Sequence, residues 1–284
     1  MKTIICATDF SPAASNAIRY SAGLAEKLKS HLLLVHSYEM PVLNFEQSAA
    51  VVSYEDEQLM LLTEKKLSAI KSKIEKDHPG LEVTTLLLEG APDKGFPEIS
   101  SKQHADLIVL GTTETSSLKR LLTASTSGHI ISEATCPVLC VPKEAKFNGI
   151  KKIIFCTDLH EDNLRAASSL VTFAKKFDAE IIFLYVDNKH FVHSEEAITE
   201  MTSTIRKHIS YLKISGYISK NPNVAEGITF FMKKHEADLL VMLTHKKHFP
   251  ETFFHPSITK TMSHEAKIPL LSMKFSDMPF FNAV

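Results

Sequence analysis

Glycine is scarce in this sequence, with 9 residues in 284, against an average of about 7%. Few positions can therefore host the positive-φ turns and close ligand approaches that glycine-rich loops supply. The P-loop and dinucleotide glycine patterns are absent, as are the serine-hydrolase elbow, the HExxH zinc helix and the CxxC pair. These absences exclude the common nucleophile and zinc enzyme types, and we expect a protein that is not an enzyme.

An excess of either charge is also lacking. Lys and Arg number 32 and Asp and Glu 33, for a formal net charge of −1. Nucleic-acid and membrane-surface binders need a basic excess, so we expect neither partner. No apolar run approaches the roughly 20 residues of a membrane helix. Asp9 interrupts the first apolar stretch too early for a signal peptide.

Cysteine is rare and lies in apolar runs, at Cys6, Cys136, Cys140 and Cys156. Cys136 and Cys140 are four apart in a stretch typical of a strand, which separates them by about 13 Å. That separation exceeds the roughly 7 Å limit for a disulfide. We expect buried, reduced thiols and a cytoplasmic protein.

The chain contains one internal repeat. Residues 2–10 (KTIICATDF) match 151–159 (KKIIFCTDL), and 105–110 (ADLIVL) match 237–242 (ADLLVM). The copies are 149 residues apart at the first match and 132 at the second, so the second copy is shorter by 17 residues. We predict one domain over 1–146, a second, shortened and divergent, over 150–275, and a tail over 276–284.

Within each copy, short apolar runs alternate with amphipathic stretches, which predicts βα units and a parallel sheet. Ser11 and Pro12 fit the start of the first helix. Ligands of such sheets lie beyond the carboxyl ends of the strands, which places Asp9 and Asp158 at the crevice. In the first copy we expect strands near 3–8, 31–37, 82–88, 106–111 and 137–141.

Three segments of the chain resemble the universal stress protein family: 8–11 (TDFS), 105–111 (ADLIVLG) and 136–142 (CPVLCVP). The resemblance implies an α/β fold with two tandem doubly wound five-stranded parallel sheets of strand order 3-2-1-4-5, of the adenine-nucleotide alpha-hydrolase-like type. It also implies that the fifth strands, near 136–141 and 267–274, pair within one chain as a pseudo-dimer. Further homodimerisation stays open.

Family members that bind ATP carry a G-x-x-G pattern followed, nine residues on, by Gly and Ser or Thr. By position, the resemblance places adenosine at Asp9 and the backbone of Ser37, and phosphate at Gly111, Ala124, Ser125 and Thr126. Two of the three glycines are missing, because Glu114 and Ala124 replace them. A carboxylate about 4 Å from a phosphate charge costs about 1 kcal/mol in water and about 4 kcal/mol at an effective dielectric of 20. The first copy therefore has a degenerate site, with ATP or AMP as its candidate ligand.

The second copy departs further from the pattern. Leu243 replaces Gly111, Lys246 replaces Glu114 and Pro256 replaces Ala124. We expect no nucleotide there.

Three histidines, His245, His248 and His255, crowd the corresponding segment of the second copy. With Asp158 they form a weak candidate for a zinc site, since imidazoles and a carboxylate suit Zn²⁺. The alternative is a solvated loop, because the adjacent lysines Lys246 and Lys247 repel a cation.

Two further segments admit a functional interpretation. Residues 38–58 form a loop and helix start that is either a plain connection, a flap over the crevice or a contact surface. The tail, with Phe280 and Phe281, either docks on its own domain or binds a partner.

Three functions follow in order of preference. The first is a non-enzymatic cytoplasmic stress-response protein that acts through contacts with an unidentified protein partner. The second is an ATP or AMP sensor that uses the N-terminal domain only. The third is a metal-binding module built on the C-terminal histidines.

Overall fold

The computed structural model describes residues 1–39, 49–112, 126–159, 162–188, 194–209, 211–244 and 268–274, with backbone only for 49–57, 162–165, 194, 208, 209 and 244. The N-terminal half consists of β1 (Thr3–Ala7), α1 (Pro12–Leu28), β2 (His31–Tyr38), α2 (Ala49–Asp77), β3 (Val83–Glu89), α3 (Pro92–Lys102), β4 (Leu107–Thr112), α5 (Thr126–Glu133) and β5 (Val138–Pro142). The five strands predicted for this half are confirmed to within one residue at each end.

The C-terminal half repeats the order in shorter form. It consists of β6 (Lys152–Cys156), α6 (Asp162–Lys175), β7 (Glu180–Asp187), α7 (Ser194–Ile209), β8 (Ile214–Lys220), α8 (Val224–His235), β9 (Leu239–Thr244) and β10 (Leu270–Lys274). Helix α7 has 16 residues where α2 has 29, so much of the length missing from the second copy comes from this helix.

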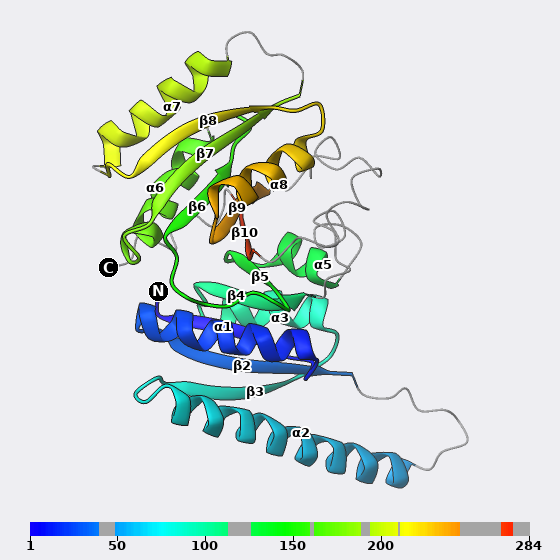
Figure 1. The fold of residues 1–284 in the computed structure, drawn as a ribbon. Helices are drawn as coiled ribbons and strands as arrows, with labels where there is room; N and C mark the ends of the chain where they lie inside the picture. The colour runs from blue at the N-terminus through cyan, green and yellow to red at the C-terminus, as the bar shows by residue number, and fades with distance from the viewer. Residues whose placement is uncertain are drawn as a thin grey trace.

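All ten strands form one sheet in the order β3-β2-β1-β4-β5-β10-β9-β6-β7-β8 (Figure 1). Neighbouring strands within each half are parallel, which confirms the doubly wound order 3-2-1-4-5 in both copies. The two halves meet where β5 and β10 pair antiparallel, with Leu271 opposite Leu139. This is the pairing of fifth strands that the resemblance implied.

The sheet is buried between two layers of helices, as parallel sheets are. Alternate side chains point to opposite faces, so Ile4 and Cys6 pack in one core and Ile5 in the other. The first core contains residues of α1, α2, α6 and α7, and the second contains residues of α3, α5 and α8. Both cores run across the two halves.

Helix α1 begins as the sequence predicts. Ser11 is the N-cap and its hydroxyl accepts a hydrogen bond from the Ala14 N–H at 3.2 Å, with Pro12 at the first helical position. The cap satisfies an amide that has no partner inside the helix.

The interior polar groups of α1 also bind the segment between the halves. The buried Asn16 amide donates to the carbonyls of Pro142 and Ala145, at 2.8 and 2.7 Å. Helix α1 is thereby fixed to the end of β5.

The cysteines are all free in the structure. Cys6, Cys136 and Cys140 are buried, and burial raises the pKa of Cys6 and Cys140 to about 12. One expectation is wrong in detail, because β5 begins at Val138 and Cys136 precedes it. The two cysteines therefore do not share a strand.

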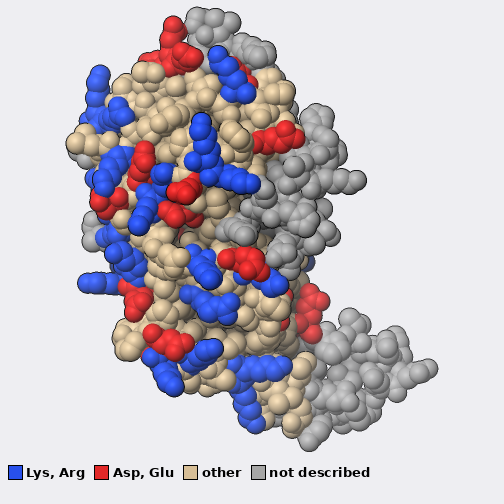
Figure 2. Space-filling view, in the orientation of Figure 1, with Lys and Arg blue, Asp and Glu red and all other residues tan. Residues whose placement is uncertain are grey.

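Acidic and basic side chains are interspersed over the face shown in Figure 2. In the described part of the chain, no helix has the length and apolar character needed to cross a membrane.

Candidate functional site

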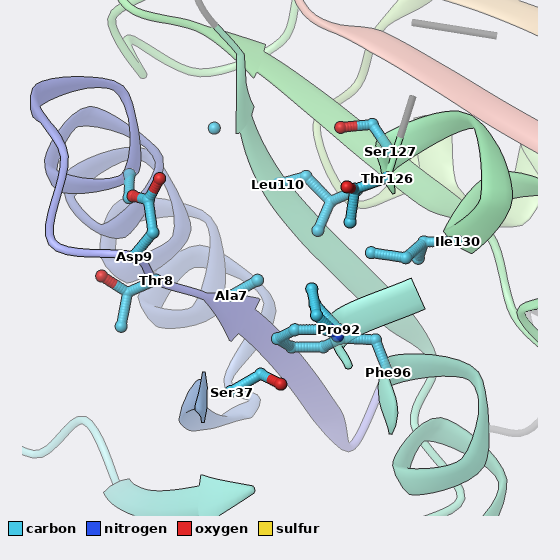
Figure 3. Close-up of a pocket in the computed structure, with 12 residues that line it drawn as sticks. Ala7, Thr8, Asp9, Ser37, Pro92, Phe96, Leu110, Thr126, Ser127 and Ile130 are labelled. Atoms are coloured by element: carbon cyan, nitrogen blue, oxygen red, sulfur yellow. The ribbon is translucent and has the colours of Figure 1, made fainter. Parts of the chain in front are cut away.

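A cleft of about 290 Å³ lies at the carboxyl ends of β1, β2 and β4 in the N-terminal half (Figure 3). Four of the predicted site residues line it: Asp9, Ser37, Gly111 and Thr126. Ala124 and Ser125, like Glu114, lie outside the described residues. The structure therefore brings together side chains that are up to 117 positions apart in the chain.

Asp9 lies in a tight turn between β1 and α1. Its Oδ1 accepts a hydrogen bond from the Ser11 N–H at 2.9 Å, and the Thr8 hydroxyl accepts one from the Phe10 N–H at 3.1 Å. Phe10 has a φ of 63°, in the left-handed region that side chains with a Cβ avoid. The turn holds an exposed carboxylate at the mouth of the cleft.

The same turn occurs in the C-terminal half. There the Thr157 hydroxyl accepts from the Leu159 N–H at 2.9 Å, and Leu159 has a φ of 64°. Asp158 is exposed at the position that corresponds to Asp9. The Thr-Asp turn is thus a local structure that both copies retain, and it does not by itself indicate a ligand.

Ser37 contributes its backbone to the cleft. Its hydroxyl donates to the Gly90 carbonyl at 2.5 Å and is therefore already engaged. The Val35 carbonyl accepts from the Thr8 N–H at 2.9 Å, so Val35 faces β1. Backbone directions alternate along a strand, and Ser37 therefore presents its N–H and C=O on the same side as Val35. At that point β1 has ended, and the cleft takes its place.

Gly111 has a structural explanation that the sequence interpretation missed. A Cβ at this position would lie 2.5 Å from the backbone carbon and oxygen of Ala13 and 2.7 Å from the Ala14 nitrogen. Residue 111 is glycine because the first turn of α1 packs directly on β4. Gly111 lines the cleft, but its lack of a side chain is no evidence of phosphate binding.

Helix α5 begins at the cleft, and Thr126 and Ser127 lie in its first turn (Figure 3). The first four N–H groups of a helix have no partner within it, and they carry the positive end of the helix dipole. This side of the cleft is therefore suited to an anion.

Helix α3 supplies an apolar wall that the sequence analysis did not identify. Pro92 and Phe96 line the cleft together with Leu110 and Ile130 (Figure 3). The signal was present, because Pro92 follows β3 at the same edge of the sheet where the other strands end.

The metal candidate is untested by the structure. Asp158 is described, whereas His245, His248 and His255 lie outside the described residues. Within the described ranges, no group of three His, Cys, Asp or Glu side chains is placed to hold a metal ion.

Comparison with known proteins identifies the family. The model of the universal stress protein family matches residues 1–142 and 149–274. A universal stress protein of Methanocaldococcus jannaschii is 32% identical over 145 residues, which cover 51% of this chain and 84% of the relative. One from Thermus aquaticus is 30% identical over 144 residues, which cover 49% of this chain and 98% of the relative.

A solved structure extends the likeness to both halves. The universal stress protein from Archaeoglobus fulgidus superposes with a TM-score of 0.67 at 14% identity, covering 96% of this chain and 98% of that one. The chain belongs to the universal stress protein family, as a tandem of two such domains.

Proposed function

We propose that the protein is a non-enzymatic stress-response protein whose N-terminal cleft binds one adenine nucleotide, with AMP favoured over ATP. The observation that carries the proposal is the convergence of Asp9, Ser37, Gly111 and Thr126 on one cleft at the carboxyl edge of the sheet. Doubly wound sheets bind ligands at this edge.

Each side of the cleft offers a different kind of contact. The Asp9 carboxylate suits the ribose hydroxyls, and the outward backbone N–H and C=O of Ser37 suit the edge of the base. Pro92 and Phe96 provide the apolar surface that a base requires. The start of α5 provides the anion side.

A volume of about 290 Å³ is at the lower end of the range for small-molecule sites, about 300–1,000 Å³. The preference for AMP rests on Glu114, which stands where the family pattern has a phosphate-side glycine; a carboxylate at that position would oppose each added phosphate charge.

Lack of catalysis is part of the proposal. Asp9 is the one titratable side chain among the described residues that line the cleft. General acid–base and nucleophilic catalysis use pairs of such groups within hydrogen-bond reach. We therefore propose a sensor rather than a hydrolase, acting in the cytoplasm.

The test compares two aspartates at corresponding positions. Asp9→Ala removes the carboxylate at the cleft, and Asp158→Ala makes the same change in the C-terminal turn. Calorimetric titration with AMP should show an affinity loss of about tenfold or more for Asp9→Ala, the size of a hydrogen bond to a charged group. Asp158→Ala should leave the affinity unchanged, and equal losses in both variants would contradict the assignment of the site.

A second candidate function, contact between protein molecules, has its own observation. Four consecutive apolar side chains of α2 are exposed: Leu59 (51%), Met60 (36%), Leu61 (45%) and Leu62 (55%). Of these, Leu59 and Leu62 are three positions apart and lie on one face of α2, and an exposed apolar pair of this kind can meet its copy about a two-fold axis. We propose that a second copy of the chain covers it.

Sedimentation velocity tests this contact. The wild-type protein should dimerise, and the double variant Leu59→Glu, Leu62→Glu should be monomeric. The control variant Leu212→Glu changes another exposed leucine, 87% exposed in the C-terminal half, and should dimerise like the wild type. A monomeric wild-type protein would refute the candidate.

A further inference from the structure

A buried lysine of the C-terminal half contacts the helix that lines the N-terminal cleft. Lys274, the last residue of β10, is 6% exposed. Its ammonium donates to the carbonyls of Ser132, at 2.5 Å, and Ala134, at 2.6 Å. These carbonyls lie at the C-terminal end of α5, whose first residues, Thr126 and Ser127, line the cleft.

We propose that Lys274 is a positioning residue for the phosphate side of the N-terminal site, so that one nucleotide site is built by both halves of the chain. The inference rests on the proposed nucleotide function. It adds a residue that lies across the junction of the two halves, outside the cleft itself.

The physical basis is the short helix α5, which runs from the cleft at its first residues to the Lys274 contact at its C-terminal end. Helix α5 has 8 residues, which corresponds to a length of about 12 Å. Helices this short are marginal alone and depend on tertiary contacts. A buried cation at the C-terminal end satisfies carbonyls without helical partners and neutralises the negative pole of the dipole. The amides at the opposite end are thereby held toward the cleft.

The register of the sheet explains how the lysine reaches α5. Strands β5 and β10 are antiparallel, with Leu270 opposite Cys140 and Ser272 opposite Val138. The end of β10 therefore lies beside the start of β5, directly after α5 (Figure 1). No flexible segment separates Lys274 from the sheet.

The two halves differ at the position that Lys274 occupies. The residue of β5 that corresponds to Lys274 is Pro142, the last residue of its strand. Proline has no donor, so the N-terminal half cannot make the reciprocal contact with the C-terminal one. Among the described residues, the lysine therefore supports the half that holds the described cleft, and Leu243 stands in place of Gly111 in the other half.

The chain also provides a matched control. Lys152 donates from its ammonium to the His235 carbonyl at 2.7 Å, at the C-terminal end of α8. This is the same type of contact, a lysine of the sheet on the end of a helix, but it lies in the C-terminal half. Lys152→Met should therefore affect stability without affecting the cleft.

The experiment is calorimetric titration of the full chain with AMP and, separately, with adenosine. We expect Lys274→Met to weaken AMP binding by about fivefold, within the range of helix-dipole contributions, and to leave adenosine binding unchanged. Lys274→Arg should restore AMP binding, and Lys152→Met should alter neither ligand. Equal weakening of both ligands, or no change in either, would overturn the inference.

Two further results keep the test decisive. If the wild-type chain binds neither AMP nor adenosine, the proposed function fails, and the inference with it. If Lys274→Met does not fold, hydrogen exchange on the wild-type chain replaces it. AMP should then slow exchange of the Leu270–Lys274 amides more than adenosine does, and equal protection by both ligands would count against Lys274.

Discussion

The methyl group that Gly111 lacks would collide with the backbone of α1, 2.5 Å away. We predict that Gly111→Ala destabilises the protein by about 1–3 kcal/mol, the usual cost of overpacking. Urea denaturation measures the loss. The control is Gly23→Ala, where the new methyl would meet a side-chain ring, that of Phe147, and not backbone, and where alanine favours the helix by about 1 kcal/mol. Equal losses in both variants would contradict the packing explanation.

Glu114 is the residue that sets the preference among nucleotides in our proposal. Glu114→Gln removes one negative charge with little change of volume, so ATP binding should tighten. A gain of about fivefold corresponds to about 1 kcal/mol, the interaction of two charges about 4 Å apart in water. Adenosine binding should not change, since adenosine carries no phosphate. Titration of both ligands checks this, and an unchanged ATP affinity would show that Glu114 does not face the phosphates.

The thiols offer a test of burial at single residues. Cys6, Cys136 and Cys140 are buried and Cys156 is half-buried, and burial raises the pKa of Cys6, Cys140 and Cys156 to about 12. Since the thiolate is the reactive form, we predict that a thiol reagent at pH 8 modifies at most Cys156 in the native protein. All four should react after unfolding in denaturant. Rapid native reaction of two or more thiols, followed by mass spectrometry, would contradict the buried placement.

At the scale of elements, α1 carries the contact that fixes the segment between the two halves. Asn16→Ala leaves the carbonyls of Pro142 and Ala145 buried without the amide that now binds them. We expect a loss of about 2–4 kcal/mol, because each unsatisfied buried group costs about 1–3 kcal/mol. Arg19→Ala is the control, since the exposed Arg19 guanidinium donates to the Asn16 side-chain oxygen at 3.1 Å, and its loss leaves both Asn16 donors on their carbonyls. Chemical denaturation should separate the two variants, and equal effects would contradict the account.

Most elements were predictable because their signals are local. The strands follow from short β-branched runs, and the start of α1 follows from Ser11 and Pro12. The pairing of β5 with β10 is different, since two apolar runs do not specify which strand lies opposite which. That expectation came from the family resemblance alone.

The candidate site was predictable only in part, for a physical reason. The place of Asp9 could be predicted because it comes directly after β1, and ligands of such sheets bind beyond the carboxyl ends of the strands. The wall of Pro92 and Phe96 depends on how α3 packs, and the contact of Lys274 depends on the register between halves. Pro92 could have been predicted from its place after the end of β3, whereas the packing of Phe96 and the register that brings Lys274 to α5 leave no local pattern in the sequence.

At the scale of the molecule, the two halves share one sheet and one continuous core on each face. Leu24, Leu139 and Ile150 pack in the same core as Phe173 and Leu271. We therefore predict a single cooperative unfolding transition, with calorimetric and van't Hoff enthalpies that agree. Two resolved transitions in scanning calorimetry would show that the halves unfold independently.

The central claim is that one cleft per chain binds an adenine nucleotide of low charge. Isothermal titration of the 284-residue chain with AMP, and then with ATP and Mg²⁺, measures the stoichiometry and the relative affinities. We predict a stoichiometry of one AMP per chain and weaker binding of ATP. Two nucleotides per chain, or ATP bound more tightly than AMP, would contradict it.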